Sequence, residues 1–123
     1  MSDKPVAERL QVRGERRLAV LGASAVLEKS IGVRKARADL ANADVVLLFA
    51  PDRARLMAQL PGLIKKASKS AILWVAYPKL TSSLAADLNR DVIRDLAPKY
   101  GLDTVSQIAI DDDWSALRLK RVY

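Results

Sequence analysis

Three nearly continuous apolar runs stand out along this chain of 123 residues. They are RLAVLGA (17–23), ADVVLLFA (43–50) and SAILWVAY (70–77), and each contains β-branched or aromatic side chains. Runs of this kind are typical of strands that are covered on both faces. Parallel neighbours cannot be joined by a tight turn, so the pattern predicts a parallel sheet with crossover helices between its strands.

The segment after the second run has apolar residues at helical spacing and predicts an amphipathic helix. Pro51 suits the first helical position, and Asp52 complements the positive end of the helix dipole. Pro61 and Gly62 interrupt the pattern, so we expect a kink or two short pieces there. The apolar positions are Leu56, Met57, Leu60, Leu63, Ile64 and Ala67.

The segment between the first two runs is short. Residues 23–43 leave too little chain for the two helices and a strand of a complete nucleotide-binding half. We expect a short helix at 25–31, with Ser24 as its N-cap, and a short strand at 33–36. The first half of the fold is therefore predicted to be a shortened version of a nucleotide-binding half.

A long polar connection, 78–88, follows the third run. Asn89 then predicts the N-cap of a helix over RDVIRDLAPKYG, with Gly101 as its C-terminal stop. Beyond it, LDTVSQIAI and WSALRLKRV alternate apolar and polar residues around the turn DDD, which predicts an antiparallel hairpin.

Together these elements predict an α/β fold: a small three-layer, Rossmann-like sandwich with a mostly parallel sheet and a C-terminal antiparallel hairpin. Residues 16–123 form the single expected domain. Residues 1–15 are polar apart from three apolar positions and are expected to be a flexible N-terminal arm. The hairpin's first strand is expected to continue the parallel sheet.

Composition removes several kinds of chemistry. The chain has no cysteine and no histidine, which excludes disulfides, thiolate catalysis, histidine-based triads and the usual zinc sites. No apolar stretch has the form of a signal peptide or the length of a membrane span. We therefore expect a cytoplasmic protein that does not associate with membranes.

The net charge of +7 is concentrated near the N-terminus. Residues 1–37 hold nine Lys or Arg against four acids, whereas residues 38–123 hold twelve against ten. Clustered bases suggest a nucleic-acid partner, yet the first aromatic side chain is Phe49, and single-strand binding needs aromatics among the bases. A solvated basic face is the favoured interpretation, with nucleic acid as an alternative.

Ligands of parallel sheets bind beyond the carboxyl ends of the strands, and this rule selects the candidate site. The strand-end residues could hold a small anion, with Lys79 as a point charge and Tyr77 as a hydrogen-bonding wall. The candidate ligand-binding residues are Gly22, Ser24, Asp52, Tyr77, Lys79, Asp113, Trp114 and Ser115.

Each candidate also has a structural interpretation. Ser24 suits a helix cap, and a dinucleotide loop would need more glycines than Gly22. The three acids at 111–113 suggest a hard cation, but calcium loops space their ligands with a glycine between them, so no metal is expected. Trp114 suits packing at a strand start. No catalytic residue is assigned.

The motifs ADVVLLF, AILWVAYPK, DLNRDVIRDLAPKYGL and IDDDWSALRLKR, in this order, resemble a family of short bacterial proteins catalogued as a domain of unknown function. The resemblance covers residues 17–121. It rests on the strand that ends in Tyr77, Pro78 and Lys79, and on the run from Asp112 through Trp114 to Arg118. Where that family often has Pro and then Glu-Gly after the first turn, this chain has Ser24, Ala25 and Val26.

More distantly, the order of elements is similar to the second half of the Rossmann-like methyltransferases that use S-adenosylmethionine. That resemblance implies a glycine-rich turn after the first strand and an acidic residue after the second. Here the turn is LGAS and the short second strand falls in the basic stretch VRKAR. No resident cofactor is expected, with S-adenosylmethionine as the alternative.

The sequence therefore favours a non-catalytic domain that binds a small anionic ligand or a protein partner at the carboxyl edge of its sheet. A small or degenerate S-adenosylmethionine-dependent methyltransferase-like protein is the alternative. Weak nucleic-acid binding through the basic N-terminal third is a second alternative. Both a monomer and a homodimer remain open.

Overall fold

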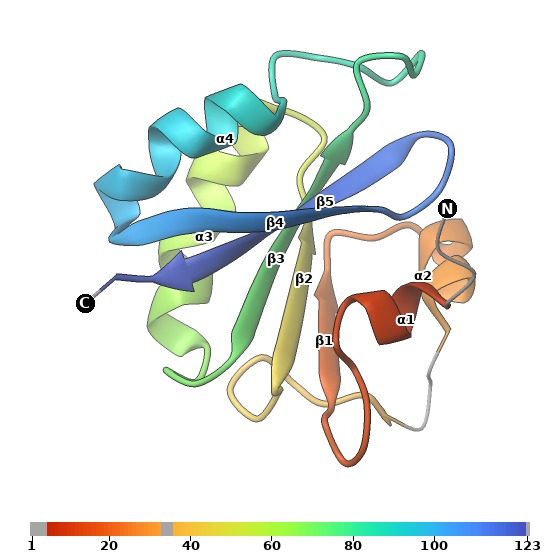
Figure 1. Cartoon of the computed structure of the whole chain (residues 1–123), viewed down its shortest axis with the longest axis vertical. Coiled ribbons are helices and arrows are strands. Elements are labelled where there is room, and N and C mark those ends of the chain that lie inside the picture. The colour runs from red at the N-terminus through yellow and green to blue at the C-terminus, as the bar shows by residue number, and fades with distance from the viewer. Residues whose placement is uncertain (1–4, 33–35, 123) are drawn as a thin grey trace.

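In the computed structural model, which describes residues 5–32 and 36–122, all three apolar runs form strands, and the alternating C-terminal segments form two more (Figure 1). The strands are β1 (Leu18–Leu21), β2 (Val45–Phe49), β3 (Ile72–Pro78), β4 (Leu102–Ala109) and β5 (Trp114–Arg121). The helices are α1 (Val6–Arg9), α2 (Ala25–Ile31), α3 (Arg53–Lys66), α4 (Arg90–Leu96) and the 3-10 turn η2 (Ala97–Tyr100).

The five strands form one mixed sheet in the order β1-β2-β3-β5-β4. β1, β2 and β3 pair in parallel, whereas β5 pairs antiparallel with both β3 and β4. The expectation of a mostly parallel sheet is therefore wrong, because half of the pairings are antiparallel. The C-terminal hairpin is confirmed, but its second strand lies beside β3 and its first strand, β4, ends the sheet.

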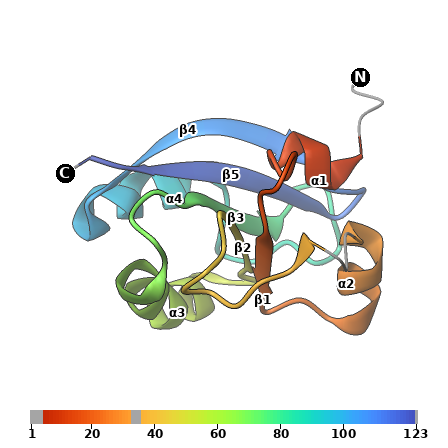
Figure 2. The same ribbon diagram turned by 90° about the horizontal axis from the view of Figure 1, so that it is seen from below.

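Helices cover both faces of the sheet, because successive strand residues point to opposite sides. Leu18, Val45 and Trp74 lie in one buried cluster, while Ala19, Val46 and Leu73 lie in the other. The first cluster contains residues of α1 and α2, and the second contains residues of α3, α4 and η2. Figure 2 shows α1 and α3 on opposite sides of the strands.

Residues 5–15 differ from the expectation of a loosely held arm. Leu10, which ends α1, is 0% exposed and packs in the cluster that contains Trp74. The Trp74 indole Nε1 donates a hydrogen bond of 3.0 Å to the Leu10 carbonyl oxygen. A fully buried leucine and a buried hydrogen bond hold this segment on the sheet, so the arm is part of the packed structure from α1 onward.

The helix caps follow the sequence closely. Ser24, Asp52 and Asn89 are the N-caps of α2, α3 and α4, and each side chain accepts a hydrogen bond from the third residue that follows it. Pro51 therefore precedes the cap of α3 and is not its first helical residue. Gly101, with a φ of 71°, ends η2 in the left-handed conformation, as predicted.

The predicted break at Pro61 and Gly62 is wrong, because α3 runs without interruption from Arg53 to Lys66. Pro61 has no N–H for the carbonyl of Met57 to accept. Met57 is 43% exposed, so water can satisfy that carbonyl oxygen at the helix surface. The expected strand at 33–36 lies mostly outside the described residues, although Arg37 forms an isolated parallel bridge with Leu18.

Candidate functional site

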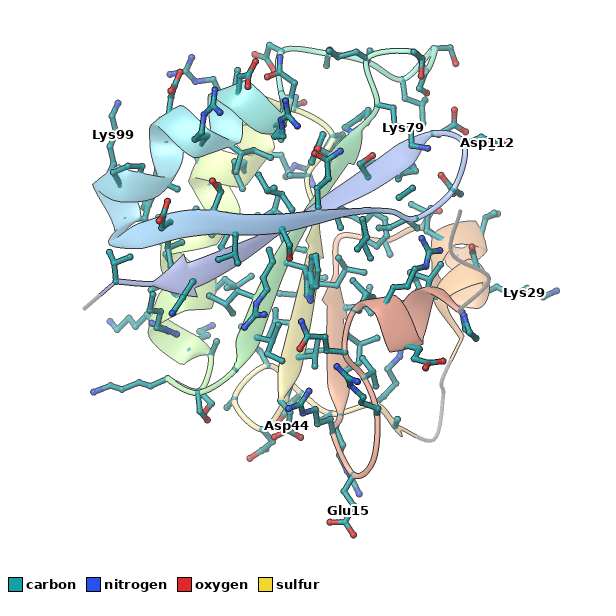
Figure 3. All side chains as sticks on the ribbon, viewed as in Figure 1. Glu15, Lys29, Asp44, Lys79, Lys99 and Asp112 are labelled. Carbon is teal, nitrogen blue, oxygen red and sulfur yellow. The ribbon has the colours of Figure 1, made fainter. Side chains whose placement is uncertain are left out.

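A cavity of about 490 Å³ opens at the carboxyl end of β3, on the face of the sheet that carries α4. Its walls come from β3, the following loop, the first turn of α4 and the two strands of the hairpin. Figure 3 shows Lys79 at this end of the molecule, and Asp44 and Glu15 at the other. The lining residues are Tyr77, Lys79, Leu80, Thr81, Asn89, Arg90, Asp91, Gln107, Ala109 and Ser115.

Tyr77 lines this cavity and carries a buried polar atom. The residue is 4% exposed, and its hydroxyl oxygen has no hydrogen-bond partner among the described residues. A buried hydroxyl left without a partner costs about 1–3 kcal/mol, and proteins rarely leave one without a reason. The Tyr77 hydroxyl is therefore the feature of the cavity that most needs an explanation.

Burial raises the pKa of Tyr77 above its ordinary value of 10.0. The positive charge of Arg90 and the nearby Ser115 hydroxyl oppose this rise, and the negative charge of Asp91 adds to it. With its pKa above 10.0, the side chain is a neutral hydroxyl at neutral pH. Tyr77 can then donate one hydrogen bond and accept another inside the cavity.

Ser115 lies opposite Tyr77 in the antiparallel register of β3 and β5. It is a buried polar residue, 4% exposed, and it lines the same cavity. The two hydroxyls are neighbours, yet no hydrogen bond of normal geometry satisfies the Tyr77 oxygen. Two buried residues with hydroxyl groups thus lie side by side on the sheet, and both line the cavity.

The charged groups of the cavity wall are Lys79, Arg90 and Asp91. Two cations face one carboxylate, so the wall carries a positive excess. Asp91 is already engaged, because its Oδ1 lies 3.0 Å from Nη2 of Arg94 and 4.0 Å from Nε of Arg90. Hydroxyl donors together with excess positive charge favour an anionic ligand over a cationic one.

The loop after β3 is fastened to the hairpin turn at the mouth of the cavity. The Ser82 hydroxyl donates to Oδ1 of Asp113 at 2.7 Å, and the Lys79 backbone N–H donates to the Asp113 carbonyl oxygen at 2.8 Å. Asp111 organises the turn itself, since its Oδ1 accepts from the backbone N–H groups of Asp113 and Trp114. These contacts fix the position of Lys79 at the end of β3.

The structure brings three of the eight predicted site residues together at the cavity, namely Tyr77, Lys79 and Ser115. Ser24 and Asp52 serve as helix caps, and Gly22 lies in the turn after β1. These three residues are not among those that line the cavity.

Asp113 and Trp114 serve the hairpin instead. Asp113 accepts from Ser82, and Trp114 packs edge-on against Phe49 with ring centroids 5.1 Å apart. Trp114 points to the α1 side of the sheet, away from the cavity, because it is one residue from Ser115 on the same strand. Its indole is a packing group.

Sequence reasoning missed Arg90, Asp91 and Gln107 as site residues. The sequence predicts Asn89 as a helix cap, and a helix that starts beside a strand end is a signal that points to Arg90 and Asp91. Gln107 gave no such signal. It reaches the cavity because β4 pairs with β5, where Gln107 lies opposite Leu117, two residues along from Ser115.

The basic N-terminal third is partly used by the fold. The Arg37 guanidinium pairs with Glu28 at 2.7 Å, and Nη1 of Arg16 donates to the Gln11 carbonyl oxygen. Nη1 of Arg9 donates to the carbonyl oxygen of Ala109 at the end of β4. These arginines hold segments together, which accounts for part of the positive charge without a nucleic acid.

Over residues 5–32 and 36–122, no group of three acidic residues is placed to hold a metal ion. The Asp111 carboxylate accepts from the backbone of its own turn, and the Asp113 carboxylate accepts from Ser82. In the same part of the chain, no helix has the length and apolar character needed to cross a membrane.

The fold is similar to that of two proteins of known structure, LepI and a methyltransferase. LepI, solved in complex with SAM, superposes with a TM-score of 0.56 and 10% identity over 94% of this chain and 39% of its own. The mitomycin 7-O-methyltransferase MmcR gives a TM-score of 0.51 and 12% identity over 68% of this chain and 31% of its own. No protein-family model and no curated protein matches the sequence.

At this identity the likeness shows the fold alone: a mixed α/β sheet with helices, similar to methyltransferase folds. The chain spans less than two fifths of the length of either protein. The resemblance to the bacterial family of unknown function therefore rests on the sequence motifs alone.

The described residues of the turn after β1 do not fit a cofactor loop. A Cβ on Gly22 would lie 2.6 Å from the Phe49 carbonyl oxygen. The backbone of Phe49 therefore occupies the space beside Gly22 that a cofactor would need. The Ser24 hydroxyl is engaged at the start of α2. We derive no methyl-transfer step from this turn.

Proposed function

We propose that the protein binds a small organic anion in the cavity at the carboxyl end of β3. One observation carries the proposal: Tyr77 lines the cavity, and its buried hydroxyl has no partner among the described residues. A ligand oxygen that accepts from Tyr77 would remove the cost of leaving that hydroxyl unpaired. Lys79 and Arg90 would then neutralise the ligand's charge.

The size of the cavity narrows the class of ligand. Small-molecule sites span roughly 300–1,000 Å³, and this cavity of about 490 Å³ lies in the lower half of that range. An inorganic ion would leave most of that volume to water. A carboxylic acid or a phosphate ester with an organic body matches the volume better, with Leu80 and Ala109 beside its apolar part.

Isothermal titration calorimetry against a panel of small carboxylic acids and sugar phosphates tests this proposal. The ligand found should bind Tyr77→Phe at least about tenfold more weakly, because a hydrogen bond to a charged group is worth about 1.5–3 kcal/mol. Lys99→Gln is the matched control, since Lys99 lies on η2, well apart from Lys79 (Figure 3), and is not among the residues that line the cavity. Equal affinity of Tyr77→Phe and wild type would overturn the assignment.

The alternative is a methyltransferase-like protein that binds S-adenosylmethionine. The fold similarity supports this alternative, and the filled turn at Gly22 argues against it. S-adenosylmethionine and S-adenosylhomocysteine belong in the same calorimetric panel. If one of these two compounds binds wild type and Tyr77→Phe equally well, its binding site lies elsewhere on the sheet and the proposed cavity is not the ligand site.

We further propose, from the sequence motifs, that the chain belongs to the bacterial family it resembles. The motif around Tyr77, Pro78 and Lys79 would then be a ligand-binding motif of that family. The second shared motif, around Trp114 and Ser115, would combine a packing residue with a cavity residue.

A further inference from the structure

A second hollow, of about 350 Å³, lies between α4 and β4. Arg90 and Gln107 line both this hollow and the cavity at Tyr77, so the two are neighbours. We call the second hollow the α4–β4 groove. Its walls include Arg94 from α4, and Thr104 and Val105 from β4.

The groove runs beside the last strand of the sheet. Among the described residues, β4 pairs with β5 on one side and with no strand on the other. Its register shifts between Thr104 and Gln107, and Val105 within that stretch is 53% exposed. An edge strand presents unpaired backbone N–H and C=O groups, which can pair with an extended peptide. Two of the backbone groups of β4 are already engaged, because the Thr104 N–H donates to Oδ1 of Asp103 and the Ala109 carbonyl oxygen accepts from Arg9.

The helix side of the groove carries two exposed cations. The side chains of Arg90 and Arg94 are 62% and 60% exposed and share one carboxylate, that of Asp91. Exposed ion pairs of this kind contribute about 0–1 kcal/mol, so an incoming carboxylate can replace Asp91 at little cost. The helix side therefore has a positive excess that is free to act on a partner.

The spacing of the two arginines matches one kind of partner. Four residues along a helix rise about 6 Å. Carboxylates at alternate positions of an extended peptide lie on the same side, about 6.6 Å apart. Arg90 and Arg94 can thus each meet one acidic side chain of a peptide that lies along β4.

We propose that the α4–β4 groove docks an extended acidic segment of a partner protein, with carboxylates at alternate positions. The peptide backbone pairs with the free edge of β4, Val105 contacts an apolar side chain, and Arg90 and Arg94 bind the carboxylates. This surface goes beyond the small-anion cavity, because Arg94, Thr104 and Val105 are not among the residues that line the cavity.

Fluorescence anisotropy with synthetic peptides tests the proposal. The probe is a labelled peptide of alternating valine and glutamate. A peptide with the same composition but with its glutamates in one block is the first control, and alternating valine and lysine is the second. We expect the alternating acidic peptide to bind wild type most tightly, and salt to weaken its binding.

Arg94→Glu should weaken binding of the alternating acidic peptide by about tenfold and shift the preference toward the lysine peptide. Lys99→Gln should leave both unchanged. Circular dichroism checks the fold, and Arg94→Gln, which adds no repulsion, is the second variant and should give a smaller loss. The proposal would be overturned if the alternating and the block glutamate peptides bound equally well. It would also be overturned if neither Arg94 variant changed the affinity for the alternating acidic peptide.

The two proposals fail separately. Loss of small-anion binding in Tyr77→Phe without any peptide binding to wild type would support the cavity and refute the groove. Peptide binding that responds to Arg94 but not to Tyr77, with no small anion bound, would support the groove and refute the cavity.

Discussion

Gly22 and Phe49 approach each other so closely that a Cβ on residue 22 would lie 2.6 Å from the Phe49 carbonyl oxygen. Gly22 also has a φ of 76°, a conformation that other residues adopt at a cost. The glycine that resembles part of a cofactor loop in the sequence is thus required where β1 ends against β2. Its role is structural.

Gly22→Ala should lower the free energy of unfolding by about 3 kcal/mol or more, since it adds a backbone clash to an unfavourable φ. Gly14→Ala is the matched control. Its φ is 62°, but a Cβ there would meet nothing within 4 Å, so the loss should be about 1 kcal/mol. Urea denaturation of both variants measures the difference, and equal losses would contradict the packing explanation.

Trp114→Ala should destabilise the fold by about 3–5 kcal/mol without removing a ligand contact. The indole is 8% exposed and packs edge-on against Phe49, on the face opposite the cavity. Trp114→Phe keeps an aromatic ring and should recover more than half of the loss. The measurement is thermal and chemical denaturation. A surface role for Trp114 would instead leave stability unchanged.

Tyr77→Phe should be as stable as wild type, or up to about 1 kcal/mol more stable, when no ligand is bound. The substitution keeps the ring and removes a buried hydroxyl that lacks a partner among the described residues. Ser115→Ala, at the neighbouring position, is a useful comparison because it removes the other cavity hydroxyl. A marked loss of stability in Tyr77→Phe would mean that the hydroxyl stabilises the unliganded fold.

Stability should fall as the pH rises above 10.0, and Tyr77→Phe should lessen the fall. Burial raises the pKa of folded Tyr77 above 10.0, so in this range the unfolded chain releases a proton that the folded protein keeps. Fewer protons on the unfolded state mean that stability decreases with rising pH. The unfolding midpoints of wild type and Tyr77→Phe, measured from pH 9 upward, test this prediction. If the two midpoints fell equally with pH, the result would contradict the raised pKa.

The strands and helices were largely predictable because their signals are local. Ser24 and Asn89 cap the expected helices, and the apolar runs form β1, β2 and β3. The uninterrupted α3 was not predictable from Pro61 alone, since the helix surface can satisfy the one carbonyl that the proline leaves. The docking of Leu10 depends on Trp74, which is distant in the sequence.

The candidate site was only partly predictable, because some of its residues meet through contacts between segments that are distant in the sequence. The strand-end rule finds Tyr77 and Lys79, because it needs only the end of β3. It cannot find Gln107 or Arg90, which reach the cavity through the pairing of β4 with β5 and the placement of α4. It also selects Trp114, whose face of the sheet depends on the register with β3.

Native mass spectrometry of freshly purified protein tests the central claim most directly. Wild type should retain a small organic anion at one copy per chain, and Tyr77→Phe, prepared in the same way, should lose it, while Lys99→Gln keeps it. The account is contradicted if all three proteins carry the same molecule in equal amounts, or if no small carboxylate or phosphate ester binds wild type when added back.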